Sequence, residues 1–411
     1  MNNWLAVLGL MTSIETSKLA LESDENPVIE NPVIEDPVVL SPHNSGPVLS
    51  WRVDVTSDQI NSTSVEYSAP AIYEERIFLG LSHKTGLHIF NRESGYYMGS
   101  MPTKSFVQSP PLIIDHQLFV ADLSGTVYAW DLQTQQILWE IELGIPVNSQ
   151  IVSAQDQLFV STNEDVFYAL NQKGEVLWRY AHRVNPSRKN NMQLFGGGTP
   201  LLREKDVVIG FSDGALVILD RYNGAVLEQL WNGTGRFPDI IAQPVAIGQS
   251  LMVASFELST WKQDASQVLW EKEVGGMHHG LLIAGEEFGL GHNRFFAHPG
   301  ADGHLRLIDT VSGNVLWDWD SGAQSALTHP QVWQNNLLIS SSTGSISIID
   351  LQTGKEIWRD RQNFNQSGSM HGPLIVDDEI FLLSKAGFLQ KYQNLSEQQW
   401  TCHDQWCSWL E

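Results

Sequence analysis

Short runs of alternating apolar and polar residues recur along the chain from Trp51 onward. The segment GTVYAWDLQTQQILW, which starts at Gly125, reads as glycine, an alternating apolar run, aspartate, a turn, two apolar residues and tryptophan. Because side chains of a β-strand point alternately to its two faces, this period of two predicts short strands joined by tight turns. The same order recurs, with substitutions, from Asp165, Gly214, Gly303 and Gly344.

The turns of this pattern repeat at a regular distance. Their positions lie 39 to 50 residues apart, at Gly95, Gln135, Gly174, Gly224, Ser266, Gly313 and Gly354. A period of roughly 40 to 50 residues with several short strands in each unit is typical of a β-propeller, in which each unit forms one blade. We therefore predict an all-β propeller of four-stranded antiparallel blades.

A second recurring segment gives the number of blades. It places a small or polar residue before an apolar hairpin, and it begins at Tyr67, Gln108, Asn148, Gly197, Ile241, His278, Leu327 and Met370. Since the first strand of each blade lines the central channel of a propeller, eight such openings predict eight blades. Only seven clear outer strands follow them. The segment LSWRVDV around Trp51 is expected to complete the eighth blade, and SEQQW, which ends at Trp400, is the competing closing strand.

Two residue types of the repeat have expected structural roles. Aspartate or asparagine at the end of one strand can cap the following turn, in which glycine supplies a positive φ. These residues are Asp131, Asn171, Asp220, Asp309 and Asp350. A tryptophan four residues after the turn position is expected to pack between neighbouring blades, with ligand stacking as the alternative. The tryptophans in this position are Trp139, Trp178, Trp270, Trp317 and Trp358.

The two ends of the chain differ from the repeat. Residues 1–20 contain the apolar run WLAVLGLM without a preceding Lys or Arg, which fits a weak secretory signal or a frayed end, and no cysteine follows it for lipid attachment. Residues 21–48 contain ENPVIENPVIEDPVVL, whose proline at every fifth position favours an extended, disordered acidic tether. The rival interpretation of this segment is a short recognition strand for a partner.

The remaining residues divide into the propeller and a short extension. The propeller is assigned to residues 49–395, and residues 396–411 form a C-terminal extension that contains Cys402 and Cys407. These cysteines are spaced for a small disulfide loop in an oxidising compartment, and two free thiols are the alternative.

Composition narrows the classes of function. Of 411 residues, 42% are hydrophobic and 17% are charged, so the chain can bury a large core. Its 24 Lys and Arg against 47 Asp and Glu give 24 − 47 = −23, a balance that disfavours nucleic acid and anionic lipid as partners. The sequence has no apolar stretch of about 18 residues, so no transmembrane segment is expected.

A search for catalytic motifs leaves one suggestive group of residues. The chain contains no HExxH, Walker loop or CxxC pattern, and the segment GFSDGALVILD at Gly210 is interpreted as a strand turn because no glycine-rich stretch leads into a helix. Histidines that could approach one another stand at the openings of blades six, seven and eight, at His278, His279, His329 and His371. Three others lie in the lengthened sixth blade, at His292, His298 and His304.

Two interpretations of these histidines stay open. Neutral imidazole is a good ligand for zinc or copper. No carboxylate or thiolate is clearly placed with them, however, so we expect a polar lining of the channel and assign no metal site, no cofactor and no catalytic residue.

The repeat resembles the PQQ-like repeat, Gly-x-x-Tyr-Ala-Leu-Asp-x-x-x-Gly-x-x-x-Trp, which the segment from Gly125 to Trp139 follows almost position by position. Length, blade number and the closing strand are most similar to the BamB family of outer-membrane β-barrel assembly lipoproteins. The resemblance covers residues 51–394 and marks a fold rather than a bound quinone. It implies a non-catalytic scaffold of the cell envelope, periplasmic or associated with the outer membrane, that binds the POTRA domains of the barrel-assembly protein.

The resemblance also implies where the partner binds, on two loops before the fourth and fifth openings. The first loop reads Leu-x-Leu-Arg in the family and Met-Gln-Leu-Phe here, at residues 192–195. The second loop carries two aspartates one residue apart, of which Asp239 is present and the other is replaced by Ile241. The expected partner-binding residues are Met192, Leu194 and Phe195 at the centre, with Arg236 and Asp239 at the rim.

The sequence thus predicts a protein-binding scaffold that acts as a monomer within a complex. One alternative is a metal-binding or enzymatic propeller that uses the channel histidines. Others are a relative of the quinoprotein dehydrogenases and an extracellular propeller that binds carbohydrate or peptide. Quinoprotein dehydrogenases pair adjacent cysteines with a calcium site, and this chain has no adjacent cysteines.

Overall fold

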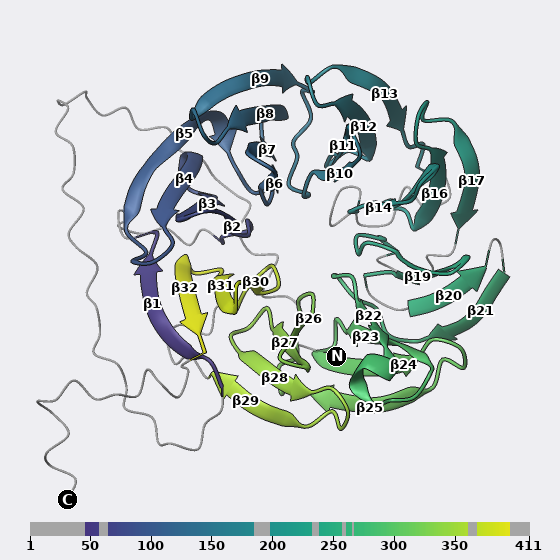
Figure 1. Cartoon of the computed structure of the whole chain (residues 1–411). Coiled ribbons are helices and arrows are strands. Elements are labelled where there is room, and N and C mark those ends of the chain that lie inside the picture. The colour runs from purple at the N-terminus through teal and green to yellow at the C-terminus, as the bar shows by residue number, and fades with distance from the viewer. Residues whose placement is uncertain are drawn as a thin grey trace, which may run out of the picture. The chain divides into compact units, whose positions relative to one another are not determined.

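A computed structural model describes residues 46–56, 65–184, 198–231, 238–256, 260–264, 267–360 and 368–394, all within the compact unit 34–411. The strands of these ranges form eight antiparallel four-stranded sheets, arranged as the blades of a ring (Figure 1). The predicted eight-bladed propeller is therefore confirmed. The predicted signal, tether and C-terminal extension lie outside the described residues, apart from the last residues of the tether.

Each blade runs from an inner strand to an outer strand. The inner strands are β2 (Ala71–Tyr73), β6 (Leu112–Ile114), β10 (Val152–Ala154), β14 (Leu201–Leu202), β18 (Val245–Ile247), β22 (Leu281–Ala284), β26 (Gln331–Trp333) and β30 (Leu374–Val376). The second strands are β3 (Arg76–Gly80), β7 (Gln117–Ala121), β11 (Gln157–Ser161), β15 (Asp206–Gly210), β19 (Ser250–Ala254), β23 (Arg294–Pro299), β27 (Asn336–Ser340) and β31 (Glu379–Leu383). All eight predicted openings lead into an inner strand.

The outer half of each blade follows the same plan. The third strands are β4 (Thr85–Asn91), β8 (Thr126–Asp131), β12 (Val166–Asn171), β16 (Ala215–Asp220), β20 (Thr260–Asp264), β24 (His304–Asp309), β28 (Ile346–Asp350) and β32 (Phe388–Gln393). The outer strands are β5 (Tyr97–Phe106), β9 (Gln136–Glu142), β13 (Val176–Ala181), β17 (Val226–Trp231), β21 (Gln267–Lys272), β25 (Val315–Asp320), β29 (Glu356–Asp360) and β1 (Val48–Asp54). Blades are numbered 1 to 8 from β2 onward.

The core lies between the faces of neighbouring blades. Second and third strands are almost wholly buried, because both of their faces meet another blade. Phe119 of blade 2 and Leu158 of blade 3, for example, belong to one cluster. A short 3₁₀ helix (Gly285–Phe288) interrupts blade 6, and no helix of the described residues is long and apolar enough to cross a membrane.

Tryptophans join successive blades as predicted. The indole N–H of Trp139 in blade 2 donates to the carbonyl oxygen of Gln172 in blade 3, at 2.7 Å. Its ring lies against the turn glycine Gly174, where an added Cβ would stand 2.7 Å from the ring. Glycine is required there because any side chain would collide with the indole and because φ is +82°. The same arrangement recurs for Trp178 on Gly224, Trp270 on Gly313 and Trp317 on Gly354.

The predicted aspartate caps are also present. Oδ1 of Asp220 accepts hydrogen bonds from the backbone N–H groups of Tyr222 and Asn223, at 2.9 and 3.1 Å. Equivalent bonds are made by Asp131, Asn171, Asp309 and Asp350. Except at Asp131, each cap holds the turn on which a tryptophan of the preceding blade rests.

The N-terminal strand closes the ring, as predicted. Strand β1 pairs with β32 from Val48 opposite Gln393 to Asp54 opposite Phe388, so the first and last segments of the chain share blade 8. Gly46, just before β1, takes the place of a turn glycine, because an added Cβ would collide with the indole of Trp358. The rival closing segment that ends at Trp400 lies outside the described residues.

Candidate functional site

The two ends of the strands carry different kinds of segment. Strands alternate in direction within a blade, so the loop after the second strand and the connector after the outer strand emerge at the same end. We call this end the connector face. The turns between the third and outer strands lie at the opposite end, which we call the turn face. Sequence placed the candidate partner loops and the histidine openings in connectors, so both belong to the connector face.

Most of the expected partner-binding residues lie outside the described residues, namely Met192, Leu194, Phe195 and Arg236. The connectors that hold them can be followed on either side. Gly198 follows the first loop, and an added Cβ there would stand 2.6 Å from the backbone oxygen of Ile240. The openings of blades 4 and 5 are therefore in direct backbone contact, which brings the roots of both predicted loops together.

Asp239 is described, and its position refines its expected role. The residue is 0% exposed, and its backbone oxygen accepts a hydrogen bond from the N–H of Phe256 at 2.8 Å. This bond joins the connector that contains Asp239 to the loop that follows β19 in blade 5. The half-buried Ile241 follows two residues later.

A polar group at the root of the first loop was not foreseen from the sequence. Nε2 of His182 lies 3.0 Å from Oδ1 of Asp213 in the next blade, and its ring stacks on Phe211 with centroids 4.3 Å apart. The His182 side chain is fully buried. This pair joins the end of β13 to blade 4 directly before the connector that carries residues 192–195. The end of β13 is therefore fixed to blade 4.

A second polar contact between blades 3 and 4 involves a residue that departs from the repeat pattern in the sequence. Asp165 stands where most other repeats have glycine, and it has a φ of 56°. Its carboxylate accepts hydrogen bonds from the backbone N–H and the hydroxyl of Ser212. Burial raises the pKa of Asp165. The departure from glycine therefore marks a polar tie between blades 3 and 4.

The structure brings together the four histidines that were predicted at the openings. The rings of His279 and His329 stack with centroids 3.7 Å apart, and those of His278 and His371 lie 6.3 Å apart. Nδ1–H of His329 donates to the backbone oxygen of His279 at 2.9 Å, because a carbonyl oxygen only accepts. The innermost segments of blades 6, 7 and 8 thus meet through imidazoles.

These imidazoles are neutral at physiological pH. Burial, followed by the neighbouring imidazoles His371 and His329, lowers the pKa of His278 to about 3. Burial also lowers the pKa of His371 to about 4 and holds that of His279 well below its ordinary value. Stacked neutral rings pack without repulsion, whereas protonation would place like charges in contact. Among the described residues, no group of three or more His, Cys, Asp or Glu side chains is arranged to hold a metal ion.

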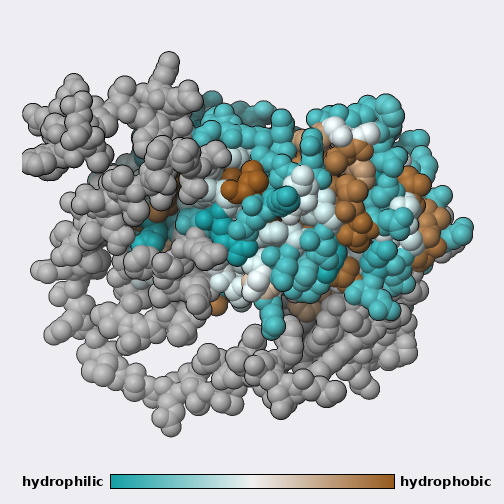
Figure 2. Space-filling view, turned by 90° about the horizontal axis from the view of Figure 1, so that it is seen from below, coloured by the Kyte–Doolittle hydropathy of each residue, from teal (hydrophilic) through white to brown (hydrophobic). Residues whose placement is uncertain are grey.

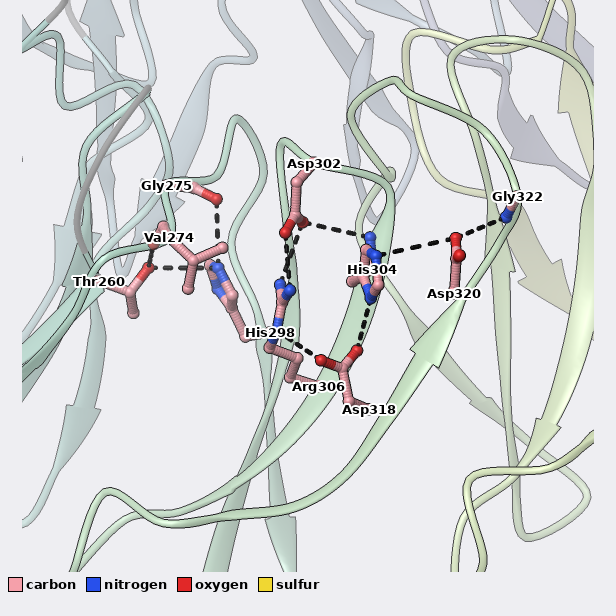
Figure 3. Close-up of polar contacts among 10 residues, drawn as sticks. All are labelled: Thr260, Val274, Gly275, His298, Asp302, His304, Arg306, Asp318, Asp320 and Gly322. Atoms are coloured by element: carbon pink, nitrogen blue, oxygen red, sulfur yellow. Dashed lines mark hydrogen bonds and ion pairs between the residues drawn. The ribbon is translucent and has the colours of Figure 1, made fainter.

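The histidines of the sixth blade have other partners. His298 is buried, and its Nε2 lies 3.3 Å from the backbone oxygen of Gly275 and 3.2 Å from the hydroxyl of Thr260 in blade 5 (Figure 3). Burial lowers the pKa of His298 to about 4. This ring therefore ties blade 6 to blade 5. His292 is exposed and contacts Glu286.

An ion-pair network lies at the rim of the same blade. Arg306 bonds both Asp302, at 2.7 Å, and Asp318, at 3.1 Å, while Nδ1 of His304 lies 2.7 Å from Asp318 (Figure 3). Burial works to raise the pKa of Asp302, but the bonds from Arg306 outweigh it and lower that pKa. Asp320 lies 3.8 Å from the same imidazole. Arg306 and His304 of β24 thus both bond Asp318 of β25, which stabilises this hairpin.

Comparison with known proteins places the chain in a family. The family model described as outer membrane protein assembly factor BamB matches residues 51–298 and 300–406. A BamB of Shewanella oneidensis is 27% identical over 286 residues, which cover 67% of this chain and 68% of the relative.

Two solved structures share the fold. BamB from Moraxella catarrhalis has a TM-score of 0.67 and 18% identity, over 85% of this chain and 100% of the other. A quinohemoprotein alcohol dehydrogenase from Pseudomonas putida has a TM-score of 0.64 and 12% identity, over 85% and 76%. The likeness of these structures concerns the fold, whereas the family model spans nearly the whole ring: the chain belongs to the outer membrane protein assembly factor BamB family.

Proposed function

We propose that this protein is a non-catalytic scaffold of the cell envelope that binds a protein partner during assembly of outer-membrane proteins. The observation that carries the proposal is the family match, which covers residues 51–298 and 300–406 and so includes every blade. Relatives in the same family are named outer membrane protein assembly factors. The proposed partner is the set of POTRA domains of the barrel-assembly protein, and the proposed place is the periplasm or the periplasmic side of the outer membrane.

The described polar groups support a scaffold more than a catalyst. His298, His182 and Arg306 each have protein partners that tie one strand or blade to another. The quinohemoprotein alcohol dehydrogenase is similar at 12% identity, which supports a common fold and no common activity. The alternative remains catalysis by the four clustered histidines, and loss of a measured turnover in a His279→Gln variant would favour it.

The proposed binding site is on the connector face, over blades 3 to 5. Met192, Leu194 and Phe195 would form its apolar centre, with Arg236 at the rim. The contact between Gly198 and Ile240 supports this site because it holds the roots of the two loops together. Asp239 would act by anchoring the second loop, since its side chain is buried.

Binding to purified POTRA domains tests the proposal with the full chain. Apolar residues at the centre of an interface typically cost about 2 kcal/mol or more when truncated. Leu194→Asp combined with Phe195→Ala should therefore weaken capture more than tenfold and leave the melting temperature nearly unchanged. Leu177→Asp is the matched control: it introduces the same charge at an exposed leucine of blade 3, near the turn face, and should leave capture unchanged.

The outcomes separate the parts of this proposal. If the wild-type chain fails to capture POTRA domains, the proposed partner is wrong. If capture is unaffected by the double substitution, the binding site lies elsewhere on the ring. A melting temperature several degrees lower would show that Leu194 and Phe195 belong to the core.

A further inference from the structure

Every outer strand carries a β-bulge at the same place. In blade 2, Trp130 pairs with Ile137 and Ala129 pairs with Trp139, which leaves Leu138 as the extra residue of β9. The pairing shifts by one residue at the equivalent point in the other described blades. The extra residues are Met98, Leu138, Leu177, Leu227, Leu269, Leu316 and Ile357 in blades 1 to 7, and Ser50 in blade 8.

The bulge orients the side chain that follows it, but this role does not require the extra residue to be apolar. In most blades the residue after the bulge is the tryptophan that docks on the next blade, so the bulge aims that side chain. The extra residue points outward, and its exposure is 45% for Leu138, 50% for Leu316 and 57% for Leu227. A polar side chain would serve the bulge equally well, as Ser50 does in blade 8.

The seven exposed residues from Met98 to Ile357 form what we call the apolar belt. In five blades the preceding residue is an exposed Val or Ile, so the belt there consists of pairs such as Val315–Leu316 and Val268–Leu269. Figure 2 shows separate apolar strips among hydrophilic surface on the side wall of the ring. Repeated exposed apolar pairs of this kind indicate a surface that is covered by another chain segment.

The chain enters the ring beside this belt. Gly46 rests on the indole of Trp358, and Ile357, the belt residue of blade 7, is its neighbour in sequence. The preceding residues 34–45 read IEDPVVLSPHNS, in which apolar side chains stand at Ile34 and at residues 38–40. The belt is interrupted in blade 8, where the bulge residue is a serine. The belt residues nearest to Gly46 in sequence order around the ring therefore belong to blades 7, 6 and 5.

We propose that residues 34–45 dock on the apolar belt from blade 7 toward blade 5. Proline favours an extended chain that rises about 3.1 Å per residue, so the seven residues from Val39 to Gly46 span about 22 Å. Packed sheets lie about 10 Å apart, and more at the rim of a ring, so this length carries Val38 and Val39 to the pair Val315–Leu316 of blade 6. Ile34 then reaches toward the pair of blade 5. The proposal concerns contacts within one chain and does not depend on the proposed function.

Cysteine cross-linking tests this contact in the full chain. In a background with Cys402→Ser and Cys407→Ser, Val39→Cys with Leu316→Cys should form an intramolecular disulfide under mild oxidation. The matched control is Val39→Cys with Leu138→Cys, which places the second cysteine at the equivalent bulge of blade 2, across the ring. Linkage to residue 316 should be at least tenfold faster than linkage to residue 138.

Other occupants of the belt give different results. Equal rates for the two pairs would overturn the proposal, and so would disulfides formed only between two chains, which would make a second copy the occupant. As a second measurement, deletion of residues 34–40 should increase the binding of an apolar fluorescent dye. Leu316→Ser with Leu269→Ser should remove that increase, and an unchanged dye signal after the deletion would show that residues 34–40 leave the belt open.

Discussion

At the scale of single residues, the ring is held by the contact of an indole with a glycine. Gly354 has a φ of +68°, and an added Cβ would lie 2.6 Å from the indole of Trp317 in the preceding blade. Gly144 has a similar φ of +75° but has open space around the Cβ position. Substitutions at Gly354 and Gly144 therefore distinguish the cost of backbone strain from the cost of disturbing the inter-blade contact.

Alanine substitutions at these two glycines should have unequal costs. Gly144→Ala should lower the free energy of unfolding by about 1 kcal/mol through backbone strain alone. Gly354→Ala should cost about 1 to 3 kcal/mol more, because the methyl group displaces the indole of Trp317 from its carbonyl partner. Chemical denaturation of both variants measures the difference. Equal losses would show that the indole moves aside at no cost.

The clustered histidines predict how stability depends on pH. Above about pH 6.5 they are neutral in the folded and unfolded states. As the pH falls, the unfolded chain takes up protons that the folded chain rejects until about pH 4 at His371 and about pH 3 at His278. Stability should therefore be complete above pH 6.5 and decline from there toward pH 3.

Denaturation at a series of pH values checks this. His278→Gln with His371→Gln should flatten the decline between pH 6.5 and 4, because glutamine takes up no proton. His292→Gln is the control, since the His292 side chain is 92% exposed and lies outside the cluster. An unchanged slope in the double variant would assign the acid sensitivity to other groups.

At the scale of elements, the closing strand contributes more than its length suggests. Strand β1 supplies the outer edge of blade 8, and the indole of Trp51 donates to the backbone oxygen of Arg92 in blade 1 at 3.3 Å. Behind it, buried Lys391 bridges Glu93 of blade 1 and Glu379 of blade 8, at 2.9 and 2.6 Å. A buried ammonium needs such partners, so the seam between the two ends of the chain is also a charge network.

Removing this strand should open the ring. Deletion of residues 50–55 is expected to lower the melting temperature well beyond the effect of deleting residues 25–40, because it exposes the apolar faces of blades 8 and 1. Differential scanning calorimetry of the two deletions makes the comparison. A similar melting temperature in both would mean that blade 8 is stable with three strands.

Sequence reasoning was strongest for these elements because their signals are local and repeated. The turn position, the capping aspartate and the tryptophan recur in most units, so number, order and closure could be predicted. The pair of His182 and Asp213 joins residues 31 positions apart and has no period, so it could not be predicted. The β-bulge could not be predicted from the sequence either, because an extra residue in one strand is recognised only when its pairing with the neighbouring strand is known.

At the scale of the whole molecule, the junctions between blades are unequal. Most junctions use a tryptophan, but Glu228 occupies its position in blade 4, opposite Ile218, and Gly99 occupies it in blade 1, opposite Ile89. The junction of blades 1 and 2 has other ties: Tyr128 bonds the backbone of Lys104, and Asp122 bonds that of Ser105. The junction of blades 4 and 5 has the apolar cluster around Trp261 and, near the openings, a bond from the Gln243 amide to the backbone oxygen of Pro200 at 2.7 Å.

We expect the ring to open first between blades 4 and 5, beside the proposed partner site. Hydrogen exchange in the native state should be faster in β17 than in β13 or β25, whose tryptophans bond the next blade. Trp178→Glu gives blade 3 the residue that blade 4 has at the equivalent position. Exchange in β13 should then rise to a rate similar to that of β17. If β17 exchanges as slowly as β25 in the wild-type chain, the apolar cluster of blades 4 and 5 holds that junction without an indole. Opening would then have to begin at another junction.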